Sequence, residues 1–159
     1  MRPGEMLFFD SMMLNLAADR GDSRLEALLE GGKVQCLIPF SVREEGSRPE
    51  SPPQIKVAIS RFIYTCDVEL NPIEKSDIAS FQRLHRGDAE PKNIDADLTH
   101  VWEAAKYQGR YFVTADRRLL NRTNEIAAYK SIQVITLDHA ISLYEVMAQQ
   151  WCLANTTEV

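Results

Sequence analysis

Apolar and polar positions alternate in blocks along the chain. Five short apolar runs have the length of buried strands, namely residues 6–9, 34–39, 66–70, 111–114 and 133–137. Between them, apolar residues recur every three or four positions, which is the spacing of one helix face. Strands that alternate with helices predict an α/β fold. We therefore expect a three-layer α/β/α sandwich with a parallel five-stranded sheet, in one domain over residues 1–159.

Polar residues and turn formers indicate where the helices begin and end. Ser23 and Ser76 are expected to cap helices, and Asp95 is expected to cap the helix before the fourth strand. Gly46 and the prolines of residues 47–53 should end the helix that follows the second strand. Residues 55–65 and 117–129 are expected to be helical.

Composition and charge restrict the function. Of the 159 residues, 45% are hydrophobic and 26% are charged, as in ordinary globular domains. No apolar run approaches the roughly 18 residues of a membrane span. The three cysteines are far apart and odd in number, which indicates reduced thiols in a cytoplasmic protein. The net charge of −5 argues against binding nucleic acid by phosphate contacts alone, but not against an enzyme that meets phosphates through a cation.

Four acidic residues map to one edge of the predicted sheet. Asp10 follows the first strand and Asp116 follows the fourth, while Glu45 and Asp97 are expected in the first turns of helices that start at that edge. Neighbouring carboxylates repel by about 4 kcal/mol per pair at an effective dielectric constant near 20. A cluster of oxygen ligands that needs a cation suits Mg²⁺ or Mn²⁺. The sequence therefore predicts a metal site.

Each acid taken alone has a simpler explanation. An acid in the first turn of a helix is stabilised by capping and by the helix dipole, by about 0.3–1 kcal/mol. For Asp116, this explanation requires a hydrogen bond from the amide of Arg118 or Leu119. A metal ligand instead requires the Asp116 carboxylate to lie near the other three.

Five segments together resemble a PIN domain. They are FFDSMMLNLA, IPFSVREE, DADLTHVWEAAKYQG, YFVTAD and VITL, which occur in the family's order and cover nearly the whole chain. The resemblance implies a ribonuclease that acts on single strands, needs Mg²⁺ or Mn²⁺, and is often the toxin of a toxin–antitoxin pair.

The resemblance also assigns residues to the site. It matches the family's acidic quartet to Asp10, Glu45, Asp97 and Asp116, and its supporting hydroxyl residues to Ser11 and Thr114. Glu44 is the alternative to Glu45. Four arginines are candidate contacts for the RNA backbone: Arg43, Arg110, Arg117 and Arg118. Tyr107 and Trp102 are candidate stacking rings, although the core is the simpler place for Trp102.

Single-stranded RNA is the expected partner, and an antitoxin protein is a candidate partner. We also expect a homodimer.

Other classes fit the residues less well. A phosphatase of haloacid-dehalogenase type needs a second aspartate where Met12 stands, and a receiver domain needs acids among residues 7–9. A dinucleotide-binding domain needs glycines after the first strand, where the chain reads DSMMLN. A PIN-like domain that binds RNA or protein without cleaving stays open. The histidines His85, His100 and His139 lack metal-ligand spacing, and we assign them no catalytic role.

Overall fold

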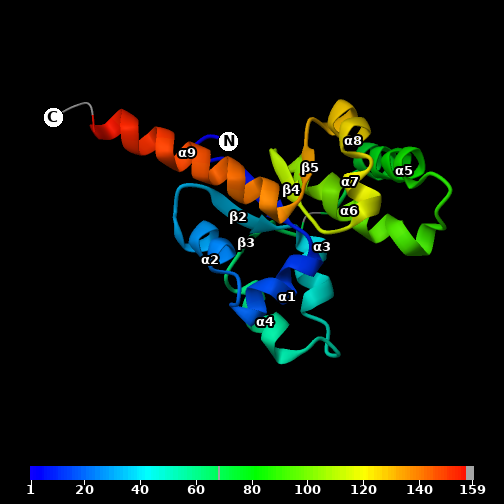
Figure 1. The fold of residues 1–159 in the computed structure, drawn as a ribbon. Helices are drawn as coiled ribbons and strands as arrows, with labels where there is room; N and C mark the ends of the chain where they lie inside the picture. The colour runs from blue at the N-terminus through cyan, green and yellow to red at the C-terminus, as the bar shows by residue number, and fades with distance from the viewer. Residues whose placement is uncertain (68, 157–159) are drawn as a thin grey trace.

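All strands of the described chain form one parallel sheet (Figure 1). The computed structural model describes residues 1–67 and 69–156. The strand order is β3-β2-β1-β4-β5, so the first strand of the chain lies at the centre. The strands are β1 Met6–Phe9, β2 Gln35–Ile38, β3 Ile63–Tyr64, β4 Tyr111–Val113 and β5 Gln133–Ile135. The predicted α/β fold with a five-stranded parallel sheet is confirmed.

Helices cover both faces of the sheet (Figure 1). One face packs against α1 Ser11–Asp19, α2 Ser23–Glu30, α4 Pro53–Ile59 and α9 Leu137–Thr156. The other packs against α5 Pro72–Arg86, α6 Pro91–Lys106, α7 Arg117–Leu120 and α8 Thr123–Lys130. The remaining helix, α3 Phe40–Gly46, follows β2 and contacts both α1 and α6. In the described part of the chain, no helix is both long and apolar enough to cross a membrane.

The central strand divides the core into two halves. Leu7 and Phe9 point to one face and Phe8 points to the other, because successive side chains of a strand alternate. All three are fully buried. Each such side chain contributes about 1.5–3 kcal/mol by leaving water. Burial on both faces explains why this strand is a continuous apolar run in the sequence.

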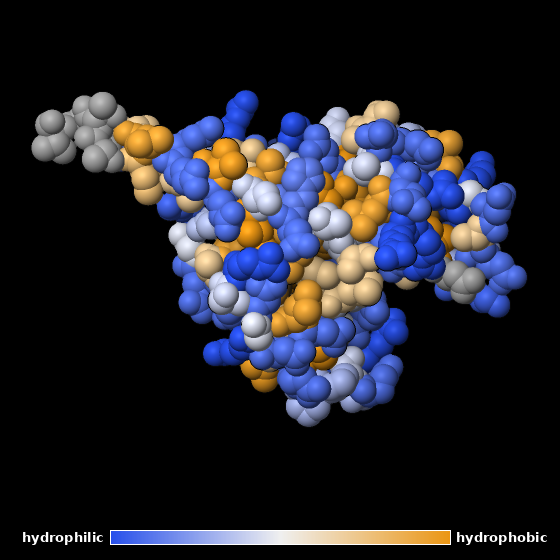
Figure 2. All heavy atoms as spheres, viewed as in Figure 1, coloured by the Kyte–Doolittle hydropathy of each residue, from blue (hydrophilic) through white to orange (hydrophobic). Residues whose placement is uncertain are grey.

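Some large hydrophobic side chains lie outside these two cores. Figure 2 shows a mainly hydrophilic face with smaller hydrophobic areas. The exposed large hydrophobic side chains include Met12 and Leu16 on α1, and Val146, Trp151 and Leu153 on α9.

The third strand is not where the apolar pattern predicted it. Residues 55–65 were expected to be helical, but α4 ends at Ile59 and β3 occupies Ile63–Tyr64. The described residues of the segment 66–70 form no strand, and Val68 lies outside the described residues. Ile63 is 55% exposed at the sheet edge, so no buried apolar run marks this strand.

Helix starts also differ from the predictions. Asp22 caps α2 through the amides of Arg24 and Leu25, in place of Ser23. Helix α5 begins four residues before Ser76, because Asn71 forms a capping box there and Pro72 suits the first helical position.

Two further helix predictions need correction. Helix α6 begins at Pro91, so Asp95 lies inside it and instead pairs with Arg86 at 2.6 Å. The helix predicted over residues 117–129 is divided into α7 and α8. The predicted end of α3 at Gly46 is confirmed.

Gly109, in the turn between α6 and β4, packs closely against Phe8 of the central strand. A Cβ atom at this position would lie 2.5 Å from Cδ2 of Phe8 and 2.9 Å from the carbonyl oxygen of Ala104. We expect Gly109→Ala to lower the free energy of unfolding by about 1–3 kcal/mol, because a buried ring and the backbone must move apart. Urea denaturation measures the change. Gly21→Ala is the control, since its Cβ would meet nothing nearer than 4.0 Å; equal losses in the two variants would contradict the prediction.

Candidate metal centre

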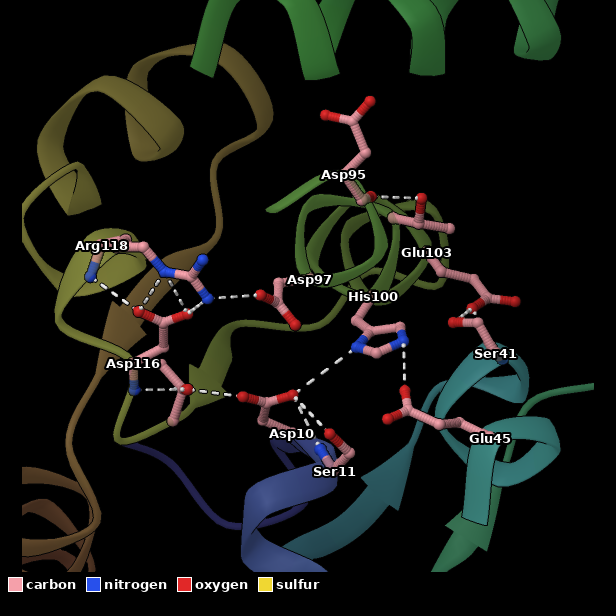
Figure 3. Close-up of polar contacts among 12 residues, drawn as sticks. Asp10, Ser11, Ser41, Glu45, Asp95, Asp97, His100, Glu103, Asp116 and Arg118 are labelled. Atoms are coloured by element: carbon pink, nitrogen blue, oxygen red, sulfur yellow. Dashed lines mark hydrogen bonds and ion pairs between the residues drawn. The ribbon is translucent and has the colours of Figure 1, made fainter. Parts of the chain in front are cut away.

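The four predicted acids converge at the carboxyl edge of the sheet (Figure 3). Asp10 follows β1 directly, and Asp116 follows the neighbouring strand β4. Glu45 comes from the end of α3, and Asp97 comes from the second turn of α6. Neither of the last two lies in a first helical turn, which corrects the prediction. Helix capping explains neither position. Asp97 lies beyond the first turn of α6, and Glu45 lies near a helix C-terminus, where the dipole disfavours an acid.

Asp10 is the buried centre of this group. The residue is 1% exposed. Its Oδ1 accepts a hydrogen bond of 2.7 Å from the amide of Ser11, and its Oδ2 accepts one of 2.7 Å from the hydroxyl of Thr114. Thr114 Oγ1 also accepts from the amide of Asp116 at 3.0 Å. The residues predicted to support the site therefore hold the carboxylate of Asp10 in one orientation.

His100 lies between two of the acids, and the sequence analysis missed it. Its Nδ1 is 3.5 Å from Asp10 Oδ1, and its Nε2 is 3.5 Å from Glu45 Oε2 (Figure 3). The imidazole is 3% exposed, and Nδ1 has no hydrogen-bond partner among the described residues. The available signal was the position of His100 three residues after Asp97, on the same helix face.

Burial and neighbouring charge act together on Asp97. Burial raises the pKa of this carboxyl group to about 6, and the carboxylates of Asp10 and Asp116 also raise it. His100 and Arg118 oppose this shift. Burial is thus the main cause of the elevated pKa, and the neighbouring carboxylates add to it.

Arg118 supplies positive charge to the same group. Its guanidinium donates to Asp116 at 2.5 Å and to Asp97 at 3.0 Å. Burial alone would raise the pKa of Asp116, but hydrogen bonds from the Arg118 side chain and amide hold that pKa below its usual range. The Arg118 amide donates to Asp116 Oδ1 at 2.8 Å, which is the hydrogen bond that the capping explanation required. Asp116 thus caps α7 and also faces the other acids.

The other candidate arginines are less close. Arg117 is exposed at the start of α7. The guanidinium of Arg43 lies 4.3 Å from the centre of the Tyr64 ring. Arg110 precedes β4, and its amide donates to the carbonyl of Met6. It therefore lies at the amino edge of the sheet, opposite the edge that carries the acids.

The residues present suit a divalent cation. Asp10, Asp97 and His100 each offer one ligand atom, and these atoms lie within 4.8 Å of one another. Carboxylate oxygens are the preferred ligands of Mg²⁺ and Mn²⁺, and an imidazole nitrogen favours Mn²⁺ of the two. A buried imidazole nitrogen without a partner is the group that a cation would satisfy.

No protein-family model matches this chain, and no curated protein sequence matches it. The resemblance to PIN domains therefore rests on the five sequence segments alone. The fold and the converging acids are established by the structure itself.

The pKa of Asp97 predicts how stability depends on pH without metal. The folded state holds this proton more tightly than the unfolded chain, so wild type loses stability as pH rises from about 4 to about 6. Asp97→Asn cannot ionise and avoids this loss. In EDTA, we expect the free energy of unfolding of the variant minus that of wild type to be larger at pH 7.5 than at pH 4.5, by about 1–3 kcal/mol. Urea denaturation across this range checks it; a constant difference would contradict the shifted pKa.

Arg118 should compete with an added cation for Asp97 and Asp116. We expect Arg118→Met to lower stability in EDTA by less than about 1 kcal/mol, because the guanidinium is half-exposed. Millimolar Mn²⁺ should then raise the melting temperature more than in wild type, because the ion no longer displaces a guanidinium. Arg117→Met is the matched control, since Arg117 makes no ion pair within the described residues. Equal Mn²⁺ responses in all three proteins would disprove the competition.

Proposed function

We propose that this protein is a ribonuclease of PIN type that hydrolyses single-stranded RNA and requires Mg²⁺ or Mn²⁺. One observation carries the proposal: Asp10, Asp97 and His100 present ligand atoms within 4.8 Å of one another, with Glu45 and Asp116 beside them. These residues come from four separate elements. Helix capping accounts for Asp10 and Asp116 singly, but it does not account for the approach of Asp97, whose charge would be repelled by both.

The side chains divide the work of phosphodiester hydrolysis. A bound Mg²⁺ or Mn²⁺ supplies charge neutralisation at the phosphate and lowers the pKa of water. Asp10, Asp97 and His100 would hold the cation, and the hydrogen bonds from Ser11 and Thr114 keep Asp10 oriented.

Glu45 is placed to act as general base. Its side chain is 41% exposed, so it reaches both His100 and solvent. A carboxylate at the open side of the site is suited to orient the attacking water and accept its proton. We prefer it to Glu44, which is exposed and has no contact with the other acids among the described residues.

Arg118 is suited to bind the substrate phosphate. A guanidinium forms paired hydrogen bonds with a phosphate as readily as with a carboxylate. With a cation held by Asp97, the guanidinium of Arg118 would keep its contact with Asp116 and could turn its other amino group to a phosphate. Arg117, beside it, adds positive charge to the same edge.

A PIN-like module that binds RNA without cleaving it is the second candidate. The observation in its favour is also Arg118, whose guanidinium already neutralises Asp97 and Asp116. Such a module would bind single-stranded RNA but would not turn it over with any divalent cation.

The toxin role and the homodimer rest on the resemblance to PIN domains. A small DNA-binding antitoxin encoded in the adjacent reading frame would support the toxin role. Sedimentation at equilibrium tests the homodimer.

Substitution of the acids distinguishes the two functions. With labelled single-stranded RNA and Mn²⁺, we expect Asp10→Asn and Glu45→Gln to reduce the cleavage rate about a hundredfold or more, because each removes a group that holds the cation or moves a proton. Glu44→Gln is the matched control and should cleave like wild type. Circular dichroism checks that each variant is folded.

The same proteins report cation binding directly. Mn²⁺ should raise the melting temperature of wild type and should do so less in Asp116→Asn. An Asp10→Asn variant as active as wild type would rule out the nuclease. RNA binding without cleavage by wild type would favour the second candidate.

A further inference from the structure

A cavity of about 170 Å³ lies beside the metal centre. Ser41 follows the carboxyl end of β2, and Cys66 follows that of β3, so the cavity opens at the same sheet edge as the acids. The lining residues that matter here are Ser41, Thr99, Trp102, Glu103, Lys106 and Tyr107. Pockets that hold a drug-sized ligand measure roughly 300–1,000 Å³, so this one suits a single ring system.

The cavity and the metal centre are built on the same pair of helices. Glu45 of α3 faces His100 of α6, and one turn further along both helices Ser41 faces Glu103 (Figure 3). The Ser41 contact thus lies about one helical turn, roughly 5–6 Å, from the Glu45 contact. The cavity is thus near enough to the metal centre to receive a base from an RNA strand whose phosphate lies there.

Glu103 presents a fixed carboxylate to the cavity. Its Oε2 accepts a hydrogen bond of 3.1 Å from the amide of Ser41 and a second bond from the Ser41 hydroxyl. Its Oε1 accepts no hydrogen bond from the residues that the structure describes. The carboxylate is therefore held in place with one oxygen available to a ligand.

Aromatic side chains form other parts of the wall. The hydroxyl of Tyr107 donates to the carbonyl of Cys66 at 3.2 Å, which positions its ring. Trp102 is 3% exposed, and its indole Nε1 donates to Asp77 at 2.8 Å. Because Trp102 is nearly buried, Tyr107 is the ring that offers its face to a flat base.

We propose that this cavity binds one base of the RNA and that the base is guanine. The inference rests on the proposed ribonuclease function and adds the substrate preference. Recognition of single-stranded RNA commonly combines stacking with hydrogen bonds to the Watson–Crick edge. The ammonium group of Lys106 also lines the cavity, where it pairs with Glu74 at 2.9 Å.

The carboxylate of Glu103 would select guanine because of the hydrogen-bond donors on the Watson–Crick edge of that base. Guanine alone carries two adjacent donors on its Watson–Crick edge, the N1 hydrogen and the N2 amino group, and both can approach a carboxylate oxygen. Adenine and cytosine place an acceptor nitrogen beside their amino group. Uracil places a carbonyl oxygen on each side of its single donor, and these oxygens would repel Glu103.

Nucleotide binding in EDTA tests the cavity without any cleavage. We expect guanosine 5′-monophosphate to bind about tenfold more tightly than the adenosine, cytidine or uridine nucleotide. Nuclear magnetic resonance should show shifts of the Trp102 indole proton and the Ser41 amide proton. Glu103→Gln should abolish the preference, and Tyr107→Leu should weaken the binding of all four. Glu145→Gln, an exposed change on α9, is the matched control and should behave like wild type.

The outcomes separate the two proposals. Equal affinity for the four nucleotides, or a guanine preference that survives in Glu103→Gln, would overturn the base site even if wild type cleaves RNA with Mn²⁺. A guanine preference in wild type that cleaves no RNA would overturn the nuclease and leave the base site standing. Where both hold, the cleavage products of a random single-stranded RNA should carry guanine at one fixed position relative to the cut.

Discussion

A buried carboxylate at the end of the central strand is the constraint around which this edge of the protein is built. Asp10 is 1% exposed, and a charge removed from water must be compensated by donors or by a cation. The amide of Ser11 and the hydroxyl of Thr114 provide two hydrogen bonds, and the His100 imidazole approaches from α6. Residues far apart in the chain thus contact the same carboxylate group of Asp10.

The compensation is incomplete for the acids taken together. Asp97 keeps a raised pKa, and Arg118 adds a guanidinium between Asp97 and Asp116. The negative charge of such a cluster can be offset by a bound proton, by the guanidinium of Arg118 or by an added cation. Binding of a divalent ion, as proposed here, would relieve the electrostatic repulsion that remains.

The helix pair α3 and α6 extends the site away from the sheet. His100 and Glu103 lie one turn apart on α6, and Glu45 and Ser41 lie one turn apart on α3. Each contact across the pair fixes a carboxylate, one at the proposed metal centre and the other in the neighbouring cavity. A ligand that spans the two would contact the proposed metal centre with its phosphate and the cavity with its base. The rigid helix pair therefore links the proposed chemistry to the proposed specificity.

Residues 6–9 and 111–114 identified their strands because both faces of these strands are buried, and local apolar runs record such burial. From these strands, parallel topology alone predicted that Asp10 and Asp116 share an edge. The edge strand Ile63–Tyr64 is exposed, so no buried apolar run marks it in the sequence. The helix starts at Asn71 and Pro91 were missed because other residues nearby are equally plausible caps. The sequence by itself therefore determined the layers, the central strands and the edge that carries the acids. Only the tertiary structure decided that His100 enters the cluster, that Arg118 neutralises it and that Arg110 lies at the other edge, because contacts between distant elements depend on packing that local patterns do not record.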